Sequence, residues 1–282
     1  MKKILVTLLT VIMAGTLSFH ASAQTLDLKW KTDTLLRVPE SVLFDASKNI
    51  LYVACIDGKP DGKDGVGSIA KVSPTGKIEQ LNWVTGLDAP KGLGLYKNNL
   101  YVADITAVDV IDITTGKVTA KVEIEGAVFL NDITVDKKGN VYVSDTRTGK
   151  IYVLKNNKPE LYFESKELQG VNGLLALPDG SLYVLDFATG FNYKLSADKK
   201  LTKFGETAQG ADGIVWVDKD GYLVSSWHGE VYYVNAQGQS QKLLDTKDQK
   251  VSAADIEFDP KSKTLYVPTF FSNSVVAYTL KK

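Results

Sequence analysis

Asn131-Asp-Ile-Thr-Val-Asp136 is one of six copies of a short pattern that recurs along this chain. The other copies are Glu40-Ser-Val-Leu-Phe-Asp45, Lys91-Gly-Leu-Gly-Leu-Tyr96, Asn172-Gly-Leu-Leu-Ala-Leu177, Asp212-Gly-Ile-Val-Trp-Val217 and Ala254-Asp-Ile-Glu-Phe-Asp259. The first residues of successive copies lie 51, 40, 41, 40 and 42 positions apart. Such a regular period predicts one structural unit that is repeated six times.

Each repeat has the sequence pattern of four short strands. A second apolar run, such as Leu182-Tyr-Val-Leu-Asp186, follows each copy after a turn such as Pro178-Asp-Gly180. A third run and a more polar fourth run complete most repeats, as in Lys150-Ile-Tyr-Val-Leu154 and Lys158-Pro-Glu-Leu-Tyr-Phe163. Four antiparallel strands repeated around an axis predict an all-β, six-bladed β-propeller.

The repeats occupy residues 24–282, which we interpret as a single propeller domain. The last repeat stops after its third strand, whereas Leu26-Asp-Leu-Lys-Trp30 precedes the first copy. We expect this N-terminal segment to supply the outer strand of the last blade and so close the ring. Repeat 1 is longest because the Gly- and Asp-rich run 57–67 is inserted, and we predict a loop there. A calcium loop is the alternative, although the final acidic ligand of an EF-hand is missing.

Residues 1–23 resemble a secretory signal peptide, with a charged start, an apolar run from Ile4 to Ala14 and a small-residue cleavage site ending at Ala23. The run is too short for a membrane anchor, so we expect an exported protein, either periplasmic or secreted. The 33 basic and 33 acidic residues balance, which gives no basic footprint for nucleic acid. Cys55 is the only cysteine, so an intramolecular disulfide is excluded and a buried thiol is expected.

The first residues of the six copies should converge on the propeller axis. The first strand of each blade lines that axis, and its start lies on the same face as the end of the second strand. This predicts an inner ring of Glu40, Lys91, Asn131, Asn172, Asp212 and Ala254. It also predicts an outer ring of Cys55, Asp104, Asp145, Asp186, Ser226 and Thr269 around the same mouth.

Four inner-ring residues carry oxygen ligands: Glu40, Asn131, Asn172 and Asp212. Carboxylate and amide oxygens suit hard divalent cations, so these four are predicted metal ligands. Calcium is the expected ion, with magnesium, manganese and zinc as alternatives. The ring has no histidine or cysteine, which argues against a typical structural zinc site. The competing interpretation is that these side chains only cap turns.

Lys91 is the exception in the inner ring, because an ammonium group repels a cation. It can point outward, pair with Asp104, or receive an anionic group of a substrate. In the outer ring, Asp104, Asp145 and Asp186 are expected to brace the following loops by accepting backbone N–H hydrogen bonds. These aspartates would also make the mouth acidic.

His228 is the only histidine after residue 23, and it lies on the predicted mouth face. It is a candidate for substrate contact or proton transfer, and a plain rim histidine is the alternative. No G-x-S-x-G nucleophile motif is present. Aromatic residues near the mouth suggest a substrate of low polarity: Phe129, Phe187, Trp227, Phe270 and Phe271.

The motifs Pro39-Glu40, Asn131-Asp132, Asn172-Gly173 and Asp212-Gly213, one per blade in that order, resemble the SMP-30/gluconolactonase/LRE family of six-bladed propellers. The resemblance covers essentially all of residues 24–282. In that family the matching Glu, Asn, Asn and Asp surround a divalent cation at the top of the central channel, and members hydrolyse sugar lactones and related esters.

The resemblance implies that Glu40, Asn172 and Asp212 are direct ligands and that Asn131 contacts the metal or the substrate. It also implies that Asp212 is the general base. Lactonases of the family often carry a sugar-binding Arg at the position of Phe129, so this chain departs from the pattern there.

The leading hypothesis is an exported, metal-dependent lactonase or esterase acting on a small molecule. Asp212 would be catalytic, and Lys91, Phe129 and His228 would bind the substrate. The alternative is a non-catalytic ligand- or protein-binding propeller of the cell envelope, similar to NHL propellers, which Phe129 and Lys91 favour. A lyase on the same fold is a third hypothesis.

Overall fold

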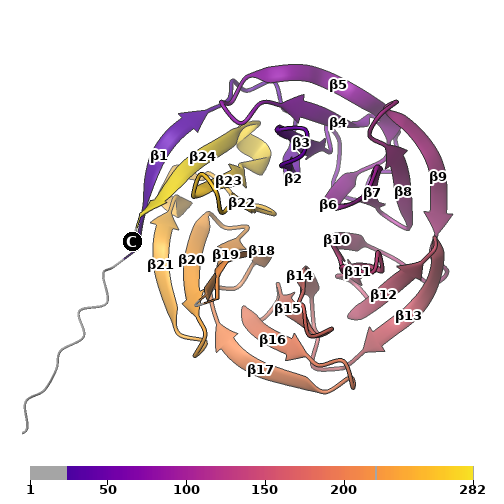
Figure 1. The fold of residues 1–282 in the computed structure, drawn as a ribbon, viewed down its shortest axis with the longest axis vertical. Helices are drawn as coiled ribbons and strands as arrows, with labels where there is room; N and C mark the ends of the chain where they lie inside the picture. The colour runs from indigo at the N-terminus through magenta and orange to yellow at the C-terminus, as the bar shows by residue number, and fades with distance from the viewer. Residues whose placement is uncertain (1–23, 220, 282) are drawn as a thin grey trace, which may run out of the picture.

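Six four-stranded antiparallel sheets surround a central axis like the blades of a propeller (Figure 1). The computed structural model describes residues 24–219 and 221–281, so the predicted signal peptide at 1–23 lies outside the described residues. The prediction of an all-β, six-bladed propeller is therefore confirmed. Within the described ranges, no helix is both long enough and apolar enough to cross a membrane.

The first three blades follow one another along the chain, each with its strands in sequence order from the axis outward. Blade 1 contains β2 (Pro39–Asp45), β3 (Ile50–Cys55), β4 (Gly67–Val72) and β5 (Ile78–Leu87). Blade 2 contains β6 (Pro90–Tyr96), β7 (Asn99–Asp104), β8 (Ala107–Asp112) and β9 (Lys117–Glu123). Blade 3 contains β10 (Leu130–Val135), β11 (Val141–Asp145), β12 (Lys150–Lys155) and β13 (Lys158–Glu164).

Blades 4 and 5 repeat this order, and blade 6 differs in its outer strand. Blade 4 contains β14 (Val171–Ala176), β15 (Leu182–Asp186), β16 (Phe191–Leu195) and β17 (Leu201–Glu206). Blade 5 contains β18 (Ala211–Asp218), β19 (Gly221–Ser226), β20 (Glu230–Asn235) and β21 (Ser240–Asp245). Blade 6 contains β22 (Glu257–Asp259), β23 (Thr264–Pro268), β24 (Val275–Lys281) and β1 (Thr25–Lys31). Two short 3-10 helices, η1 (Lys247–Gln249) and η2 (Phe270–Ser272), lie between strands.

The ring closes through the N-terminal strand, as predicted. Strand β1 pairs antiparallel with β24, from Thr25 opposite Lys281 to Lys31 opposite Val276. Figure 1 shows β1 at the outer edge of the last blade, beside β24. Because the two ends of the described chain share one sheet, separating them would break a whole strand pairing.

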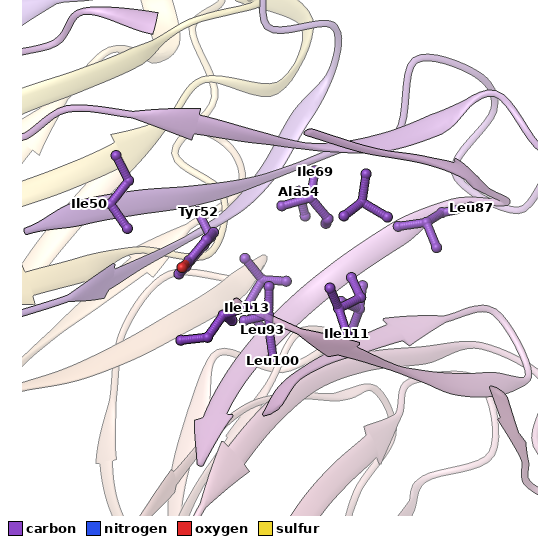
Figure 2. Close-up of a cluster of buried hydrophobic side chains, with 11 residues drawn as sticks. Ile50, Tyr52, Ala54, Ile69, Leu87, Leu93, Leu100, Ile111 and Ile113 are labelled. Carbon is purple, nitrogen blue, oxygen red and sulfur yellow. The ribbon is translucent and has the colours of Figure 1, made fainter. Parts of the chain in front are cut away.

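The hydrophobic core lies between neighbouring blades. Alternate residues of each strand point to opposite faces of the sheet. Each face of a blade packs against one of its two neighbouring blades. Between blades 1 and 2, Tyr52 and Ile69 lie in one cluster with Leu100 and Ile111, all of them buried (Figure 2). The first four residues of the inner strands β2, β6, β10, β14 and β18 are buried as well. The blades therefore hold the starts of the inner strands at fixed positions around the axis.

Candidate metal and ligand site in the central channel

The inner-ring residues lie at irregularities in the strand pairing. The register between the first two strands shifts across Pro90–Leu93, Leu130–Ile133, Val171–Leu174 and Ala211–Ile214, and across Pro39–Ser41 in blade 1. Each of these intervals contains one predicted ring residue. A bulge of this kind turns a side chain away from the normal alternation of a strand. Five blades thus direct one polar residue each toward the channel, while Ala254 of blade 6 is buried in an apolar cluster.

Aspartates of the outer ring hold these strand starts in place. Asp104 accepts hydrogen bonds from the backbone N–H groups of Asp88 and Ala89, at 2.9 and 2.7 Å. Asp145 does the same for the two residues before β10, and Asp186 for Gln169 and Gly170 before β14.

The predicted bracing of the following loops is confirmed for two of the three aspartates. Asp145 accepts from the N–H of Arg147, and Asp186 accepts from that of Thr189. No such bond to the residues after Asp104 is found in the described part of the chain. The bonds common to all three aspartates instead reach back to the start of the inner strand.

A cavity of about 370 Å³ opens at this end of the channel. Its polar lining residues are Glu40, Lys91, Asn131, Thr146, Asn172 and Asp212, which we call the polar set. Its apolar wall consists of Ile56, Pro60, Phe129, Phe187, Trp227, Phe270 and Phe271. The volume and the mixture of an apolar wall with a few polar groups are typical of a small-molecule site.

Hydrogen bonds within the polar set orient both amides. Nδ2 of Asn172 donates to Oδ1 of Asp212 at 2.9 Å, and Nδ2 of Asn131 donates to Oγ1 of Thr146 at 3.0 Å. Two buried acceptor atoms, Oε2 of Glu40 and Oδ1 of Asn172, have no hydrogen-bond partner among the described residues. Buried polar atoms normally find a partner, so these two oxygens are available to a ligand or an ion in the cavity.

Burial and nearby negative charge disfavour the ionised forms of both carboxylates of the polar set. Burial, followed by repulsion from Asp212, raises the pKa of Glu40 well above its ordinary value of 4.5. Burial and repulsion from Asp255 likewise raise the pKa of Asp212 well above 3.8. A bound cation would offset both repulsion and lost hydration, since an opposite charge favours the ionised form of a carboxyl group.

The residues present fit a hard divalent cation by their chemistry. Both amide nitrogens of the polar set are used as donors, which leaves the amide oxygens beside the carboxylates of Glu40 and Asp212. Oxygen-only donors of this kind suit calcium, magnesium or manganese. Across residues 24–219 and 221–281, no group of three or more His, Cys, Asp or Glu side chains is arranged to hold a metal. Any cation here would therefore depend on the two asparagines as well as the two acids.

Lys91 points into the cavity and not outward. Only 1% of its surface is exposed, and its Nζ donates to the carbonyl of Ala89 at 2.9 Å. The Nζ also lies 4.4 Å from the centre of the Phe129 ring. Asp104 does not form the suggested ion pair with it, because Asp104 binds backbone N–H groups and lies 3.7 Å from Nζ of Lys121. The position of Lys91 therefore excludes the outward orientation and the ion pair with Asp104, and it is compatible with the third interpretation, in which Lys91 receives an anionic group.

Of the other two predicted substrate-contact residues, only one lies at the cavity. Phe129 lines the cavity, whereas His228 is exposed and is not among the lining residues. Its ring lies 6.4 Å from that of Phe187 and 5.6 Å from that of Trp227, so it stands on the rim behind the wall.

Sequence reasoning missed Ile56, Pro60 and Thr146 as lining residues. A simple signal could have found two of them, because the wall is built largely from the residue that follows each outer-ring position. This rule gives Ile56, Thr146, Phe187, Trp227 and Phe270, which line the cavity, and Ile105, which does not. Four of the five lining residues directly follow the second strands β3, β11, β15 and β19, and Phe270 comes two residues after β23. The ends of the second strands therefore both brace the ring and present lining residues of the cavity.

Residues 57–66 of the inserted run form a loop, as predicted, whereas Gly67 begins β4, and the loop reaches the cavity. Pro60 lies in the lining, and Asp61 forms an ion pair with Arg147 of blade 3 at 2.9 Å. The guanidinium of Arg147 also lies 4.7 Å from the centre of the Phe129 ring. The ion pair thereby links the loop of blade 1 to blade 3, next to the Phe129 ring that Lys91 also contacts.

A second cavity of about 370 Å³ occupies the other part of the channel, lined by the later residues of the inner strands. It contains the carboxyl groups of Asp132, Asp255 and Glu257. These acids are bound internally: Asp132 accepts from the N–H of Leu174 at 2.6 Å, and Asp255 accepts from Oγ of Ser41 at 2.6 Å. These hydrogen bonds therefore tie neighbouring inner strands together below the polar set.

No protein-family model matches the chain, and no curated protein sequence is similar to it. Solved structures do share the fold. A catalytically inactive histidine-to-alanine variant of virginiamycin B lyase from Staphylococcus aureus, with quinupristin, superposes with a TM-score of 0.66 at 13% identity, covering 92% of this chain and 100% of that one. A streptogramin B lyase gives 0.67 at 10% identity, covering 92% and 98%. A chain of a nidogen/laminin complex gives 0.64 at 16% identity, covering 78% and 84%. At these identities the likeness establishes the six-bladed propeller fold alone.

Proposed function

We propose that this protein is an exported, cation-dependent hydrolase that opens a lactone or cleaves a carboxylic ester. The observation that carries the proposal is the pair of unpartnered oxygens, Oε2 of Glu40 and Oδ1 of Asn172, in a cavity that also contains Asp212. The order of Glu40, Asn131, Asn172 and Asp212 along the blades, which resembles SMP-30/gluconolactonase-type propellers, supports the same function.

Glu40, Asn131, Asn172 and Asp212 would hold the cation. When bound, such an ion supplies Lewis acidity that polarises an ester carbonyl. Asp212 is the candidate proton acceptor for the attacking water, because burial makes its ionised form a stronger base than an exposed aspartate. The water oxygen would bond to the carbonyl carbon, the ester C–O bond would break, and the proton held by Asp212 would pass to the departing alkoxide. The products are an acid and an alcohol, joined in one molecule when the substrate is a lactone.

The apolar wall determines which substrates can enter. Phe129, Phe187 and Trp227 present aromatic surface where a sugar would need hydrogen-bonding groups. We therefore expect lactones or esters with an alkyl or aryl body to be better substrates than sugar lactones.

The test is turnover on a panel of alkyl lactones, sugar lactones and aryl esters, together with metal analysis of the purified protein. The wild type, supplied with Ca²⁺, Mg²⁺ or Mn²⁺ after treatment with a chelator, should hydrolyse members of the panel. Asp212→Asn should reduce kcat by at least about a hundredfold, since it removes the proton acceptor. If the cation-loaded wild type hydrolyses no compound of the panel faster than Asp212→Asn does, the proposed hydrolase function is wrong.

A non-catalytic binding propeller is the second candidate, and two observations favour it. The buried ammonium of Lys91 shares the cavity with the candidate ligands, and Phe271 beside the mouth is 63% exposed. Aromatic residues are enriched at protein interfaces, so an exposed Phe at the mouth fits a binding surface. In that case a cation would raise the melting temperature of the wild type without any turnover on the panel.

A further inference from the structure

We propose that Lys91 and Phe129 form a subsite for a carboxylate group of the substrate, so that the cavity selects acidic compounds with an apolar body. This inference deepens the proposed function and depends on it for the reaction, but not for binding. It assigns to Lys91 a role that a cation ligand cannot have, because an ammonium group offers only donors.

Lys91 has unused hydrogen-bonding capacity. An ammonium group has three N–H donors, and only the bond to the Ala89 carbonyl is formed within the described residues. The side chain is almost fully buried and, in the same part of the chain, forms no ion pair. A buried charge without a partner is costly, so a built anion site is the arrangement that compensates it.

The charged neighbours of Lys91 are compatible with this role. Burial lowers the pKa of Lys91, and the attraction of Glu40, Asp104 and Asp61 opposes that change. Glu40 is not within ion-pair distance, and its Oε2 remains without a partner. If Glu40 contributes to holding a cation, Lys91 is left as the positive group that faces the ligand.

Phe129 fixes the position of this charge. Two cations lie over its ring, Nζ of Lys91 at 4.4 Å and the guanidinium of Arg147 at 4.7 Å from the ring centre. Arg147 is held in turn by Asp61 at 2.9 Å. Cation–π contacts of this kind restrain the lysine without neutralising it. The ammonium is therefore presented at a defined place beside an aromatic surface.

The wall supplies the rest of the recognition. Trp227, Phe270 and Phe271 form a cluster with ring centres 4.7 to 6.1 Å apart, and they line the same cavity as Lys91. A ligand with a hydrocarbon body would bury apolar surface there while its carboxylate meets Lys91. A phenylalkanoate is the simplest compound with both properties.

The experiment compares two probes of equal shape and different charge, 4-phenylbutanoate and 4-phenylbutanamide, by isothermal titration calorimetry on the full chain. Wild type should bind the carboxylate about tenfold or more tighter than the amide, as expected for one charge-assisted hydrogen bond in a buried site. Lys91→Met should lose this preference, and Lys91→Arg should keep most of it. Lys71→Met is the matched control, because Nζ of Lys71 lies 4.0 Å from the Trp83 ring, outside the cavity.

Each outcome decides the inference. Equal affinity of wild type for the two probes, a preference that survives Lys91→Met, or no binding of either probe overturns it. Thermal unfolding of each variant confirms that it is folded before titration. A carboxylate preference in a protein that hydrolyses nothing supports the subsite and removes the hydrolase. Hydrolysis of panel compounds without a preference for the carboxylate probe supports the hydrolase and contradicts the carboxylate subsite.

Discussion

Asn172 donates a hydrogen bond to Asp212 across the boundary between blades 4 and 5, with 2.9 Å between Nδ2 and Oδ1. The bond fixes which end of the amide faces the carboxylate. The oxygen of Asn172 is consequently the end left without a partner. One contact thus joins two blades, partly stabilises a buried carboxylate and leaves a buried acceptor of a cavity-lining residue without a partner.

Asn172→Ala should remove most of the stabilisation that a divalent cation gives. The variant loses an oxygen ligand and also the donor that orients Asp212, so the affinity for the ion falls. We expect Ca²⁺ or Mn²⁺ at millimolar concentration to raise the melting temperature of the wild type clearly and that of the variant little. Differential scanning calorimetry with and without chelator measures this.

Asn192→Ala is the control for that measurement, because Asn192 is equally buried in the same blade but does not line the cavity. It should change the baseline stability and leave the cation effect intact. An undiminished cation effect in Asn172→Ala would contradict the assignment of Asn172 as a ligand.

Gly173→Ala should destabilise the protein. A Cβ atom at this position would lie 2.2 Å from the backbone carbonyl oxygen of Asp212, which cannot move without shifting β18. Overpacking of this kind typically costs about 1–3 kcal/mol. Urea unfolding should show the loss, whereas Gly62→Ala, on an exposed loop where a Cβ would meet only the side-chain tip of Asp64 and atoms of Lys59, should change stability much less. Equal stability of the two variants would mean that the inner strands are not closely packed here.

Asp186→Ala should be among the most destabilising substitutions of a polar residue in blade 4. Its carboxylate accepts from the N–H groups of Gln169 and Gly170, and from both N–H and Oγ1 of Thr189. Leaving buried donors unpaired costs about 1–3 kcal/mol each, so a total loss above about 2 kcal/mol is expected in urea unfolding. Ser226→Ala, which removes a single bond to the Gln209 carbonyl in blade 5, should cost less. The reverse order would show that the aspartate is not a structural brace.

The fold was predictable because each repeat carries the same local information. The alternation of apolar residues, the turn residues between strands and the constant spacing all indicate the same unit, and local signals that agree with one another specify a structure well. The N-terminal strand β1 was predictable by elimination, since blade 6 lacks one strand and Leu26–Trp30 has no other partner.

The details of the site were less predictable because they depend on contacts between distant segments. The ring positions of Glu40, Asn172 and Asp212 follow from the repeat, but the bulges that turn their side chains inward do not. The loop that brings Pro60 to the cavity is held by a pair between Asp61 and Arg147, which are 86 residues apart. No periodicity in the sequence encodes such a pair.

Glu257 should make the stability of the cation-free protein depend on pH. Burial raises its pKa from 4.5 to about 7, although backbone N–H bonds from Phe258 and Phe44 oppose the rise. The unfolded chain loses this proton near pH 4.5, whereas the folded protein keeps it until about pH 7. The contribution of Glu257 is therefore fully present below pH 4.5 and is lost as pH rises through about 7.

Glu257→Gln stays neutral at every pH. The free energy of unfolding of the variant should therefore rise relative to that of the wild type as the pH increases from 4.5 to 8. Glu257 is partly accessible through the second channel cavity, and solvent screening there limits the gain to at most about 3 kcal/mol. Urea unfolding in chelator at several pH values measures the difference, with Asp248→Asn on the exposed η1 helix as the control. A difference between Glu257→Gln and wild type that does not change with pH would mean that Glu257 is ionised in the folded state as readily as in the unfolded chain.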